Sequence, residues 1–478
     1  MRVILINPPV LDLRIGRGIS PVAKRLFFNS PPLGIAYLAA VLEKNEIPVS
    51  IIDAAVENLS ITALCARIKE YAPDIVGLTS TTNLFDSAVV TAGRIKEILP
   101  RAKLVLGGSH ISANPRHAFS SGFFDAGVRG EGEITFLELI KAFETGRSLE
   151  EIKGLVFRKG ESLHFTPPRE FVEDLDQLPL PARHLLAMEK YISQPNDQYR
   201  LPKLSMIASR GCPYGCIFCD KNVFGRRYRS FSPTYIVSEM QCLVSEYGAR
   251  DIAVLDSTFT VSIQRVEGII EEMKRQNLKV NWTCTVRADM VSYELLKKMR
   301  EAGCWRVRLG VESGSDEVLA FIKKGITREQ VKNAARWAHK LGLQPKGFFM
   351  IGHLVDTRET INETMRFARS LPLKDITLQI NTPMPNTEQY DYCKDYGTFA
   401  VEDFKDFSYW EPVFIPRGLS RDYLTKAFRR FYRSFYLRPV IFWRHLCSIR
   451  SGYDLVKYAL AAGLVFALFF RRTKPYNK

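Results

Sequence analysis

Short apolar runs alternate with longer amphipathic stretches through the first 140 residues. The runs at 2–7, 49–53, 74–80 and 103–108 are rich in Val, Ile and Leu, as buried strands are. Between them, apolar positions recur at helical spacing, in residues 32–46, 61–72 and 86–100. Strands that alternate with helices form βαβ units around a parallel sheet. The pattern therefore predicts an α/β fold that begins with a doubly wound, Rossmann-like domain at residues 1–145.

The predicted strands end in small and polar residues, in the stretches "NPP" at 7–9, "TSTTN" at 79–83 and "GGSHISANP" at 107–115. Ligands of open α/β sheets bind beyond these carboxyl ends. Glycine lets a ligand approach the backbone, although Gly107 and Gly108 also suit a plain turn. The candidate ligand contacts at this edge are Ser80, Gly107, Gly108 and His110.

The stretch "VRGEGEITFLELIKAF" at 128–143 places two acids, Glu131 and Glu133, just before a predicted helix. Acidic groups stabilise a helix N-terminus, so we expect helix capping from at least one of them. Polar, proline-rich residues follow, and we interpret 146–200 as a linker.

Strand and helix patterns resume at residue 201. Six strand-like runs interleave with helical stretches up to about residue 400, which is enough for a central partial (β/α)6 barrel of parallel strands. Residues 401–478 are then predicted to form a basic, helical C-terminal region.

The formal net charge of +16 is concentrated in that region, because residues 417–478 hold fourteen Lys or Arg and two Asp. The remaining chain is nearly neutral, so nucleic-acid binding by the whole chain is not expected. Nine cysteines without dense, even spacing do not suit a disulfide scaffold. The start, "MRVILINPP", lacks the apolar run of a signal peptide, so we expect a cytoplasmic location.

Three cysteines, Cys212, Cys216 and Cys219, follow the first strand of the second domain in "RGCPYGCIFCDK". Barrel active sites lie at that carboxyl mouth. A structural zinc site needs four ligands, and a complete ferredoxin-type cluster needs four cysteines. Three thiolates on a 4Fe-4S cluster would leave its fourth iron open to a ligand. The alternative is a zinc knuckle completed by a distant cysteine, namely Cys242, Cys284 or Cys304.

The C-x3-C-x2-C spacing, with aromatic Phe218 before the last cysteine, resembles that of the radical S-adenosylmethionine (SAM) superfamily. The resemblance implies a 4Fe-4S cluster whose open iron chelates SAM. It also implies reductive cleavage of SAM to a 5′-deoxyadenosyl radical. The electron would come from an external reductant such as flavodoxin or ferredoxin.

Further motifs stand where that superfamily has its SAM contacts: "LDSTFT" with Asp256, "TVRAD" with Arg287, and "LGVESGS" with Glu312 and Ser313. The resemblance implies that these side chains face the methionine and ribose of SAM. A helix cap for Asp256 and a surface ion pair for Arg287 are the other interpretations. Two stretches depart from the family pattern, "MIGHLVDTRET" in place of a "GLPGET"-like turn and "TPMPNTEQY" in place of "PGT".

Residues 1 to about 400 resemble the subgroup with an N-terminal cobalamin-binding domain, on the ordered stretches "NPP", "PPLGIAYLAAVLE", "GGSH" and "GEGE". The resemblance implies a corrinoid between the sheet and the barrel mouth. The cobalt-ligating pattern D-x-H-x-x-G is absent and His110 is the nearest histidine, so we expect no protein histidine below the cobalt. We favour methyl transfer to an unactivated carbon, or a related modification of the carbon skeleton, of a small-molecule or lipid substrate. Oxygen-independent oxidation, as in anaerobic magnesium-protoporphyrin monomethyl ester cyclase, is the alternative.

Two further classes fit less well. RNA methylthiolation enzymes carry three N-terminal cysteines, whereas residues 1–200 hold Cys65 alone. A zinc-dependent nucleic-acid-binding protein would suit the basic and aromatic stretch "KNVFGRRYRS", but not its βα surroundings.

The tail interleaves aromatic residues with arginines at 423–445, and residues 458–470 form thirteen uncharged positions. A spanning helix needs about 20 apolar residues. Two interpretations stay open. One is an interfacial helix in peripheral contact with anionic lipid at the inner membrane face. The other is a helix packed on the barrel.

Overall fold

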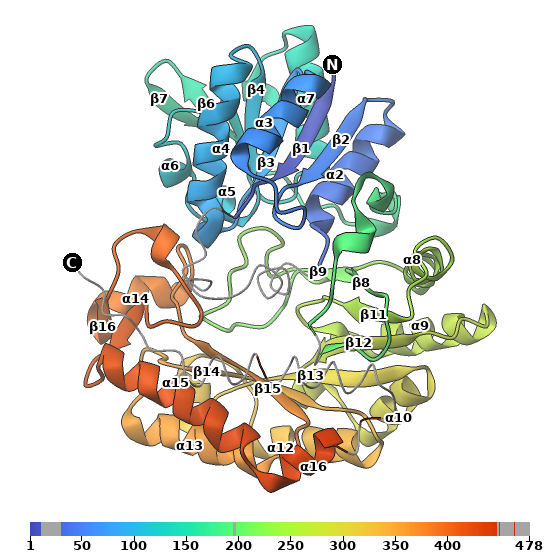
Figure 1. Cartoon of the computed structure of the whole chain (residues 1–478), viewed down its shortest axis with the longest axis vertical. Coiled ribbons are helices and arrows are strands. Elements are labelled where there is room, and N and C mark those ends of the chain that lie inside the picture. Colours follow the sequence, from blue (N-terminus) through green and yellow to red (C-terminus); the bar gives the residue numbers. More distant parts are fainter. Residues whose placement is uncertain (11–29, 195–196, 447–448, 450–462, 464–478) are drawn as a thin grey trace.

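The computed structural model describes residues 1–10, 30–194 and 197–446, together with the single residues 449 and 463. Of the apolar run at 458–470, all but Gly463 lies outside the described residues. Two sheets dominate the chain, and the N-terminal sheet lies above the mouth of a curved second sheet (Figure 1). The cysteine loop, residues 211–228 with Cys212, Cys216 and Cys219, runs between the two sheets.

The N-terminal sheet has seven strands in the order β2-β1-β3-β4-β5-β6-β7. The first five are parallel, as the βαβ pattern predicts. Their bounds are β1 (Val3–Asn7), β2 (Val49–Asp53), β3 (Ile75–Thr79), β4 (Lys103–Gly107) and β5 (Ala126–Val128). The predicted doubly wound architecture is therefore confirmed.

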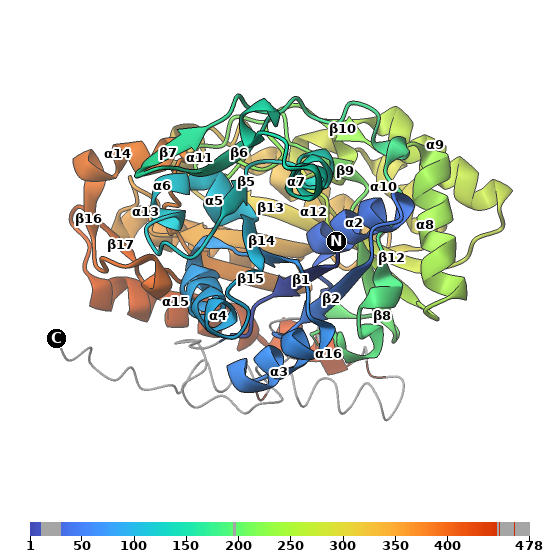
Figure 2. The ribbon, with the colours of Figure 1, turned by 90° about the horizontal axis from the view of Figure 1, so that it is seen from above.

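Helices cover both faces of this sheet because successive strand residues point to opposite sides. On one face, Val3 and Leu5 pack with helices α2 (Leu33–Lys44) and α7 (Glu133–Thr145). On the other, Ile4 and Ile6 pack with α3 (Ile61–Tyr71) and α4 (Phe85–Ile98). The view from above shows the two helix layers on either side of β1 (Figure 2). The short helices α5 (Ser109–Ala113) and α6 (Pro115–Ala118) follow β4 at the carboxyl edge.

Part of the predicted linker belongs to the sheet. Strands β6 (Leu155–Lys159) and β7 (Ser162–Phe165) form an antiparallel hairpin that extends the sheet beyond β5. The segment has a polar pattern because only the first three residues of β6 are buried, whereas Arg158, Lys159 and all of β7 are exposed or half-buried. Short 3-10 turns then lead to the second sheet.

The second sheet is a curved half-barrel of six parallel strands in the order β15-β14-β13-β12-β11-β8. Their bounds are β8 (Lys203–Met206), β11 (Asp251–Val254), β12 (Asn281–Val286), β13 (Cys304–Glu312), β14 (Lys346–Ile351) and β15 (Asp375–Ile380). Helices line the convex side (Figure 1): α8 (Pro233–Ser245), α9 (Ile263–Arg275), α10 (Tyr293–Glu301), α12 (Arg328–Lys340) and α13 (Arg358–Ser370). The short helix α11 (Asp316–Phe321) follows the carboxyl end of β13. This confirms the predicted partial (β/α)6 barrel.

The C-terminal region closes the edge at β15. Helix α14 (Glu388–Tyr396) and the hairpin β16 (Gly397–Phe399) and β17 (Phe414–Pro416) lead to α15 (Arg421–Tyr436) and α16 (Pro439–Leu446). Most aromatic residues of α15 are buried in the barrel core, namely Phe428, Phe431, Tyr432 and Phe435, so this part of the basic tail packs on the barrel. In the part of the chain that the structure describes, no helix is long and apolar enough to cross a membrane.

The tyrosines of α15 also bond to the last strand of the half-barrel. The Tyr432 hydroxyl accepts the backbone N–H of Leu378 at 3.1 Å, and the Tyr436 hydroxyl accepts that of Ile376 at 3.3 Å. Both backbone groups lie on β15. These two bonds join the helix to the backbone of the edge strand.

Candidate cofactor site at the mouth of the half-barrel

The three predicted cluster ligands lie on one loop, residues 211–228, between the short strands β9 (Ser209–Arg210) and β10 (Arg229–Ser230). Cys216 is buried, Cys212 is half-buried and Cys219 is exposed. A hydrogen bond from the Cys219 thiol, together with the nearby positive charges of Lys324 and Arg287, lowers the pKa of Cys216 to about 6. The same bond raises the pKa of Cys219 well above its usual value. Because iron binds thiolates, these surroundings fit a cluster ligand.

The zinc-knuckle alternative lacks its fourth ligand. Cys304 opens β13, so it lies at the opposite end of that strand from the mouth. Cys284 is buried within β12, and Cys242 lies on the outer helix α8. Among the described residues, no three His, Cys, Asp or Glu side chains are grouped so as to hold one metal ion.

Asp256 follows β11 and supports the entry to the cysteine loop. Its carboxylate accepts the backbone N–H groups of Ala208 at 2.7 Å and Ser209 at 3.0 Å, and the Ser209 hydroxyl at 2.6 Å. The Arg265 guanidinium lies 3.3 Å from the same carboxylate. Burial raises the pKa of Asp256, and Arg265 and these bonds oppose that shift. Both carboxylate oxygens therefore already have protein donors.

Arg287 follows β12 and is buried, so the surface-ion-pair interpretation is wrong. Its Nε and Nη2 each donate to the Asp289 carboxylate at 3.0 Å. The guanidinium carbon lies 3.6 Å from the ring centroid of Tyr214, a residue of the cysteine loop. This contact places the positive charge of Arg287 beside the loop.

Glu312 and Ser313 end β13, where the pairing with β14 shifts register. Glu312 has a φ of 64°, a left-handed conformation uncommon for non-glycine residues and found often at functional sites. Its carboxylate accepts the Lys324 ammonium at 2.7 Å. A Cβ at Gly310 would lie 2.8 Å from the Glu312 carboxylate and 2.9 Å from Lys324 Nζ, so glycine leaves room for this pair. Ser313 is buried and shares a hydrogen bond with Thr364 at 3.1 Å.

At the carboxyl edge of the N-terminal sheet, Ser80 and Gly108 pack directly together. The backbone N–H of Ser80 donates to the carbonyl of Gly107 at 3.1 Å. Gly108 has a φ of 101°, and a Cβ there would lie 2.6 Å from the Ser80 carbonyl oxygen. Glycine is thus required by the turn itself. Gly107 is the less confined of the two, since a Cβ there would be 4.0 Å from its nearest atom.

His110 is fully buried, and protein groups engage both ring nitrogens. Nδ1 lies 3.3 Å from the Thr82 hydroxyl and Nε2 lies 3.0 Å from Nδ1 of His117. Its ring stacks on Phe85 with centroids 4.2 Å apart. Burial, with the neighbouring His117, lowers the pKa of His110 to about 3. Both ring nitrogens therefore already have partners within the protein at this edge.

Two family models match this sequence. The B12 binding domain model matches residues 19–140, and the Radical SAM superfamily model matches residues 206–368. An uncharacterized methyltransferase of Pyrococcus horikoshii is 34% identical over 443 residues, which cover 92% of this chain and 94% of that protein. The chain belongs to the radical SAM superfamily, in the group with a B12-binding domain.

Two further comparisons agree with this placement. The anaerobic magnesium-protoporphyrin IX monomethyl ester cyclase of Cereibacter sphaeroides is 30% identical over 427 residues, covering 87% of this chain and 69% of that protein. The fold resembles that of the cobalamin-dependent SAM radical enzyme OxsB, solved with aqua-cobalamin and SAM bound, with a TM-score of 0.76 at 18% identity. That match covers 98% of this chain and 72% of OxsB. The radical SAM chain is therefore an enzyme that uses a 4Fe-4S cluster, SAM and cobalamin.

The barrel mouth of this radical SAM protein also holds buried polar atoms without partners. They belong to His353 after β14, Asn381 after β15 and Gln389 in α14, all at most 1% exposed. Both ring nitrogens of His353, Asn381 Oδ1 and Gln389 Nε2 have no hydrogen-bond partner among the described residues. Such groups are costly unless something satisfies them.

The three polar residues adjoin the cysteine loop. The backbone N–H of Gln389 donates to the carbonyl of Ile217 at 3.1 Å. The half-buried ring of Phe218 lies 6.0 Å from that of His353 and 6.0 Å from Lys324 Nζ. The chemistry of the Cys216–Cys219 pair, with Lys324 and Arg287 nearby, therefore suits iron binding, and the polar residues of the barrel mouth border the loop that carries this pair.

Three contributors were missed by the sequence interpretation. Lys324 lies in a loop after α11, and nothing in "IKKGIT" sets it apart from Lys323. Tyr214 is separated from Arg287 by more than seventy positions, so only the fold brings them together. His353 gave a signal, because it stands in the stretch "MIGHLVDTRET", which departs from the family turn.

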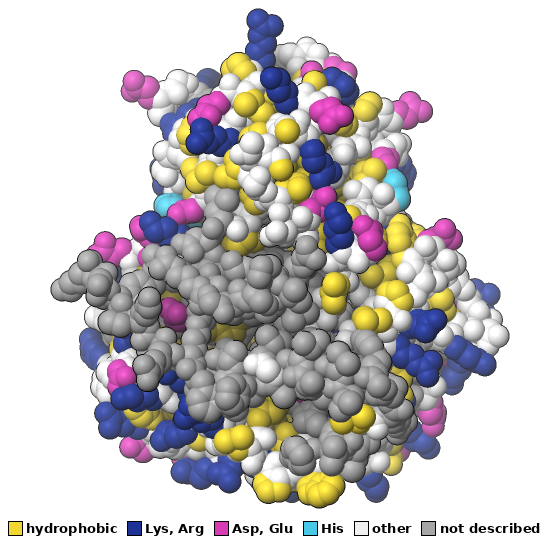
Figure 3. Space-filling view, viewed as in Figure 1, with side chains coloured by type: hydrophobic (Ala, Val, Ile, Leu, Met, Phe, Trp, Pro, Cys, Tyr) yellow, Lys and Arg dark blue, Asp and Glu magenta, His cyan; other side chains and the backbone are white. Residues whose placement is uncertain are grey.

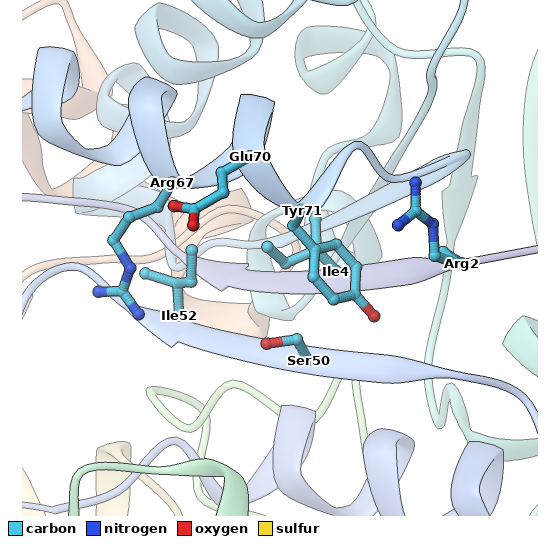
Figure 4. Close-up of a pocket in the computed structure, with 7 residues that line it drawn as sticks. All are labelled: Arg2, Ile4, Ser50, Ile52, Arg67, Glu70 and Tyr71. Atoms are coloured by element: carbon cyan, nitrogen blue, oxygen red, sulfur yellow. The ribbon is translucent and has the colours of Figure 1, made fainter.

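A separate pocket of 350 Å³ lies on the N-terminal sheet near its β2 edge (Figure 4). It is lined by Arg2, Ile4, Ser50, Ile52, Arg67, Glu70 and Tyr71. Arg67 already pairs with Glu57 at 2.8 Å, and the Arg2 guanidinium donates to the carbonyl of Ala72 at 2.7 Å. None of these residues belongs to the barrel mouth.

Proposed function

We propose that this enzyme transfers a methyl group to an unactivated carbon of a small-molecule or lipid substrate. The observation that carries the proposal is the place of the cysteine loop, which runs between the carboxyl edge of the B12-binding-type sheet and the mouth of the half-barrel (Figure 1). A methyl carrier on the sheet and a radical source on the loop would both face that space. The likeness to the Pyrococcus methyltransferase over nearly the whole chain supports it.

Named residues take separate roles in this proposal. Cys212, Cys216 and Cys219 hold the cluster. His353 and Arg287 contact SAM at the strand tips. When bound, the cluster would supply the electron that cleaves SAM to a 5′-deoxyadenosyl radical, and cobalamin would serve as the methyl carrier.

On the opposite side, the corrinoid would lie on the edge formed by Ser80, Gly107 and Gly108. We assign the parallel part of the sheet domain to residues 1–145, the β6–β7 hairpin and the linker to 146–200, the radical SAM domain to 201–400 and the basic helical region to 401–478. An external reductant such as flavodoxin or ferredoxin would supply the electron, and nucleic acid is not expected as a partner.

The first test is the iron and cobalt content per chain in protein purified without oxygen from cells supplied with cobalamin. About four irons and one cobalt would support the assignment, following the three cysteines and the B12-binding domain. The second test adds SAM and a reductant to the loaded protein and measures two products. Methyl donation releases S-adenosylhomocysteine, whereas reductive cleavage releases 5′-deoxyadenosine. Both products are expected; a protein that forms neither contradicts the proposal.

Oxidative cyclisation is the second candidate, because of the 30% identity to the anaerobic cyclase. This reaction consumes no methyl group. Formation of 5′-deoxyadenosine without S-adenosylhomocysteine in the same assay would favour it over methyl transfer.

We further propose a cytoplasmic enzyme that touches the inner membrane face through its C-terminal region. Hydrophobic side chains gather at the bottom of the molecule, over the end of α15 and α16 (Figure 3). Leu437, Val440 and Trp443 there are 70%, 46% and 60% exposed. Sedimentation with anionic lipid vesicles tests this, with Trp443→Ser expected to reduce binding. Equal recovery of the intact and variant proteins in the supernatant would oppose it.

A further inference from the structure

Glu131 and Glu133 join the B12-binding-type sheet to the base of the cysteine loop. Both follow β5 at the carboxyl edge of the sheet and are buried, although the sequence indicates helix capping for at least one of them. Glu133 does lie in the first turn of α7, but the N-cap position is Gly132 and no side chain caps it. The carboxylates instead point at two arginines.

Those arginines, Arg210 and Arg229, are directly opposite each other in the antiparallel pair β9–β10. They mark the two ends of the loop that carries the cysteines. The Glu131 carboxylate accepts Arg229 Nη1 at 2.9 Å and Nη2 at 2.8 Å, a bidentate pair. Arg210 Nη2 donates to Glu133 at 2.5 Å, and Arg210 Nη1 lies 3.2 Å from Glu131. Each side chain of this four-residue clamp is at most 6% exposed.

The surrounding contacts allow the clamp little freedom. Glu131 also accepts the backbone N–H of Val172 at 3.1 Å, and Arg229 donates to the Val172 carbonyl at 2.8 Å. The Arg229 guanidinium stacks on Phe171, 4.5 Å from its ring centroid. Bidentate Arg–carboxylate pairs fix orientation as well as distance. Breaking a buried pair on one side leaves an uncompensated charge.

We infer that Glu131 and Glu133 are positioning residues that set the place of the cysteine loop relative to the carboxyl edge of the sheet. This deepens the proposed function and rests on it, because that edge is where the corrinoid would lie. The clamp makes the two cofactor sites mechanically dependent on each other. A change at the sheet edge is transmitted to both ends of the cluster loop without touching a cysteine.

The test compares Glu131→Gln and Glu133→Gln with a control, Glu173→Gln. Glu173 pairs with Arg227 on the same loop at 2.6 Å, but that pair is 54–65% exposed, and exposed pairs contribute little. Hydrogen exchange is measured in the protein before cofactors are loaded. We expect exchange of residues 211–228 to accelerate at least tenfold in Glu131→Gln, less in Glu133→Gln, and not in Glu173→Gln.

A second measurement uses the reconstituted protein. Iron content and the electron paramagnetic resonance spectrum of the reduced cluster are recorded with and without added aqua-cobalamin. Glu131→Gln is expected to keep its iron but to lose the cobalamin-dependent change in the spectrum that the wild type and Glu173→Gln give. If Glu131→Gln does not fold, the same two measurements on Glu133→Gln test the proposal.

Unchanged exchange in both clamp variants, or exchange that accelerates equally over the whole chain, would overturn the inference. The inference would also be overturned if the electron paramagnetic resonance spectrum of the wild-type cluster did not change when cobalamin binds. A wild type that binds neither iron nor cobalamin would instead defeat the proposed function, and the exchange experiment would still decide whether the clamp positions the loop.

Discussion

Ser209 and Asp256 are joined twice, since both the backbone N–H and the hydroxyl of Ser209 donate to the Asp256 carboxylate, at 3.0 and 2.6 Å. Ser209 begins β9, the two-residue strand that leads into the cysteine loop. Sequence similarity implied that Asp256 faces SAM. In the structure, the two carboxylate oxygens of Asp256 instead bind the strand that leads into the cysteine loop, on the barrel side. Glu131 binds Arg229 at the other end of the loop, on the side of the N-terminal sheet.

Asp256→Asn separates the two roles. An amide keeps one acceptor but presents an N–H2 group to Ser209 and Arg265, so about 1–3 kcal/mol of unfolding free energy should be lost. Urea denaturation measures this loss. SAM affinity per loaded cluster should change little. A variant of unchanged stability that binds SAM at least tenfold more weakly would restore the direct-contact interpretation.

We predict that each of the three loop cysteines is individually required for the cluster. Cys216→Ala removes the most buried of the three thiols, and a cluster held by two thiolates should be lost on purification. We expect iron content to fall below half of the wild-type value and 5′-deoxyadenosine formation to become undetectable. Cys242→Ala, on α8, is the matched control and should keep both. Deoxyadenosine formation by the Cys216 variant would refute the assignment.

His353→Leu should weaken SAM binding while leaving the cofactor-free protein at least as stable. The substitution removes two buried nitrogens that have no partner among the described residues, and an unsatisfied polar group is costly in the folded state. Loss of one hydrogen bond to the nucleoside predicts about fivefold weaker binding. Equilibrium dialysis with cluster-loaded protein measures it.

The control for that experiment is His339→Leu, at an exposed position on α12. A purely structural role for His353 would give the reverse result, with stability falling and the affinity of the folded protein for SAM unchanged.

Acid should destabilise the protein through His110. Its pKa is lowered to about 3 in the folded chain, whereas an unfolded histidine titrates near 6.5. Between these values the unfolded chain takes up a proton that the folded chain does not. The free energy of unfolding therefore falls as pH decreases from about 6.5, by up to about 1.4 kcal/mol per pH unit.

Urea denaturation at pH 7.5 and 5.5 measures the effect. His110→Phe, which retains stacking on Phe85, should lose less stability over this interval than the wild type. His184→Phe, at a 60% exposed side chain, should behave as the wild type does. Equal pH dependence in all three proteins would mean that the buried ring does not control it.

The architecture could be predicted because its causes are local. The alternating strand and helix patterns can be recognised in windows of ten to fifteen residues. The three cysteines Cys212, Cys216 and Cys219 lie within eight residues. The environment of those cysteines could not be predicted in the same way. Glu131 and Arg229 are 98 positions apart, and only the pairing of two domains makes them neighbours.

Other features were obscured by ambiguous chemistry. The hairpin β6–β7 is half polar, so its pattern resembles that of a linker. His110 at a strand end suits a ligand contact equally well, until Thr82 and His117 are seen to occupy its nitrogens. The sequence shows which polar groups are present, whereas their burial and their hydrogen-bond partners decide which of them are available to bind a ligand.

A half-barrel, unlike a closed one, ends in strands with unpaired backbone groups, and such edges invite strand addition from another molecule. The hydroxyls of Tyr432 and Tyr436 meet this hazard on β15 by taking the N–H groups of Leu378 and Ile376. Helix α15 thus satisfies backbone N–H groups that a seventh strand would otherwise bond, and it does not create a new sheet edge. We expect these two tyrosines to limit such strand addition, and replacing both by phenylalanine should leave the core packed but make the protein prone to self-association.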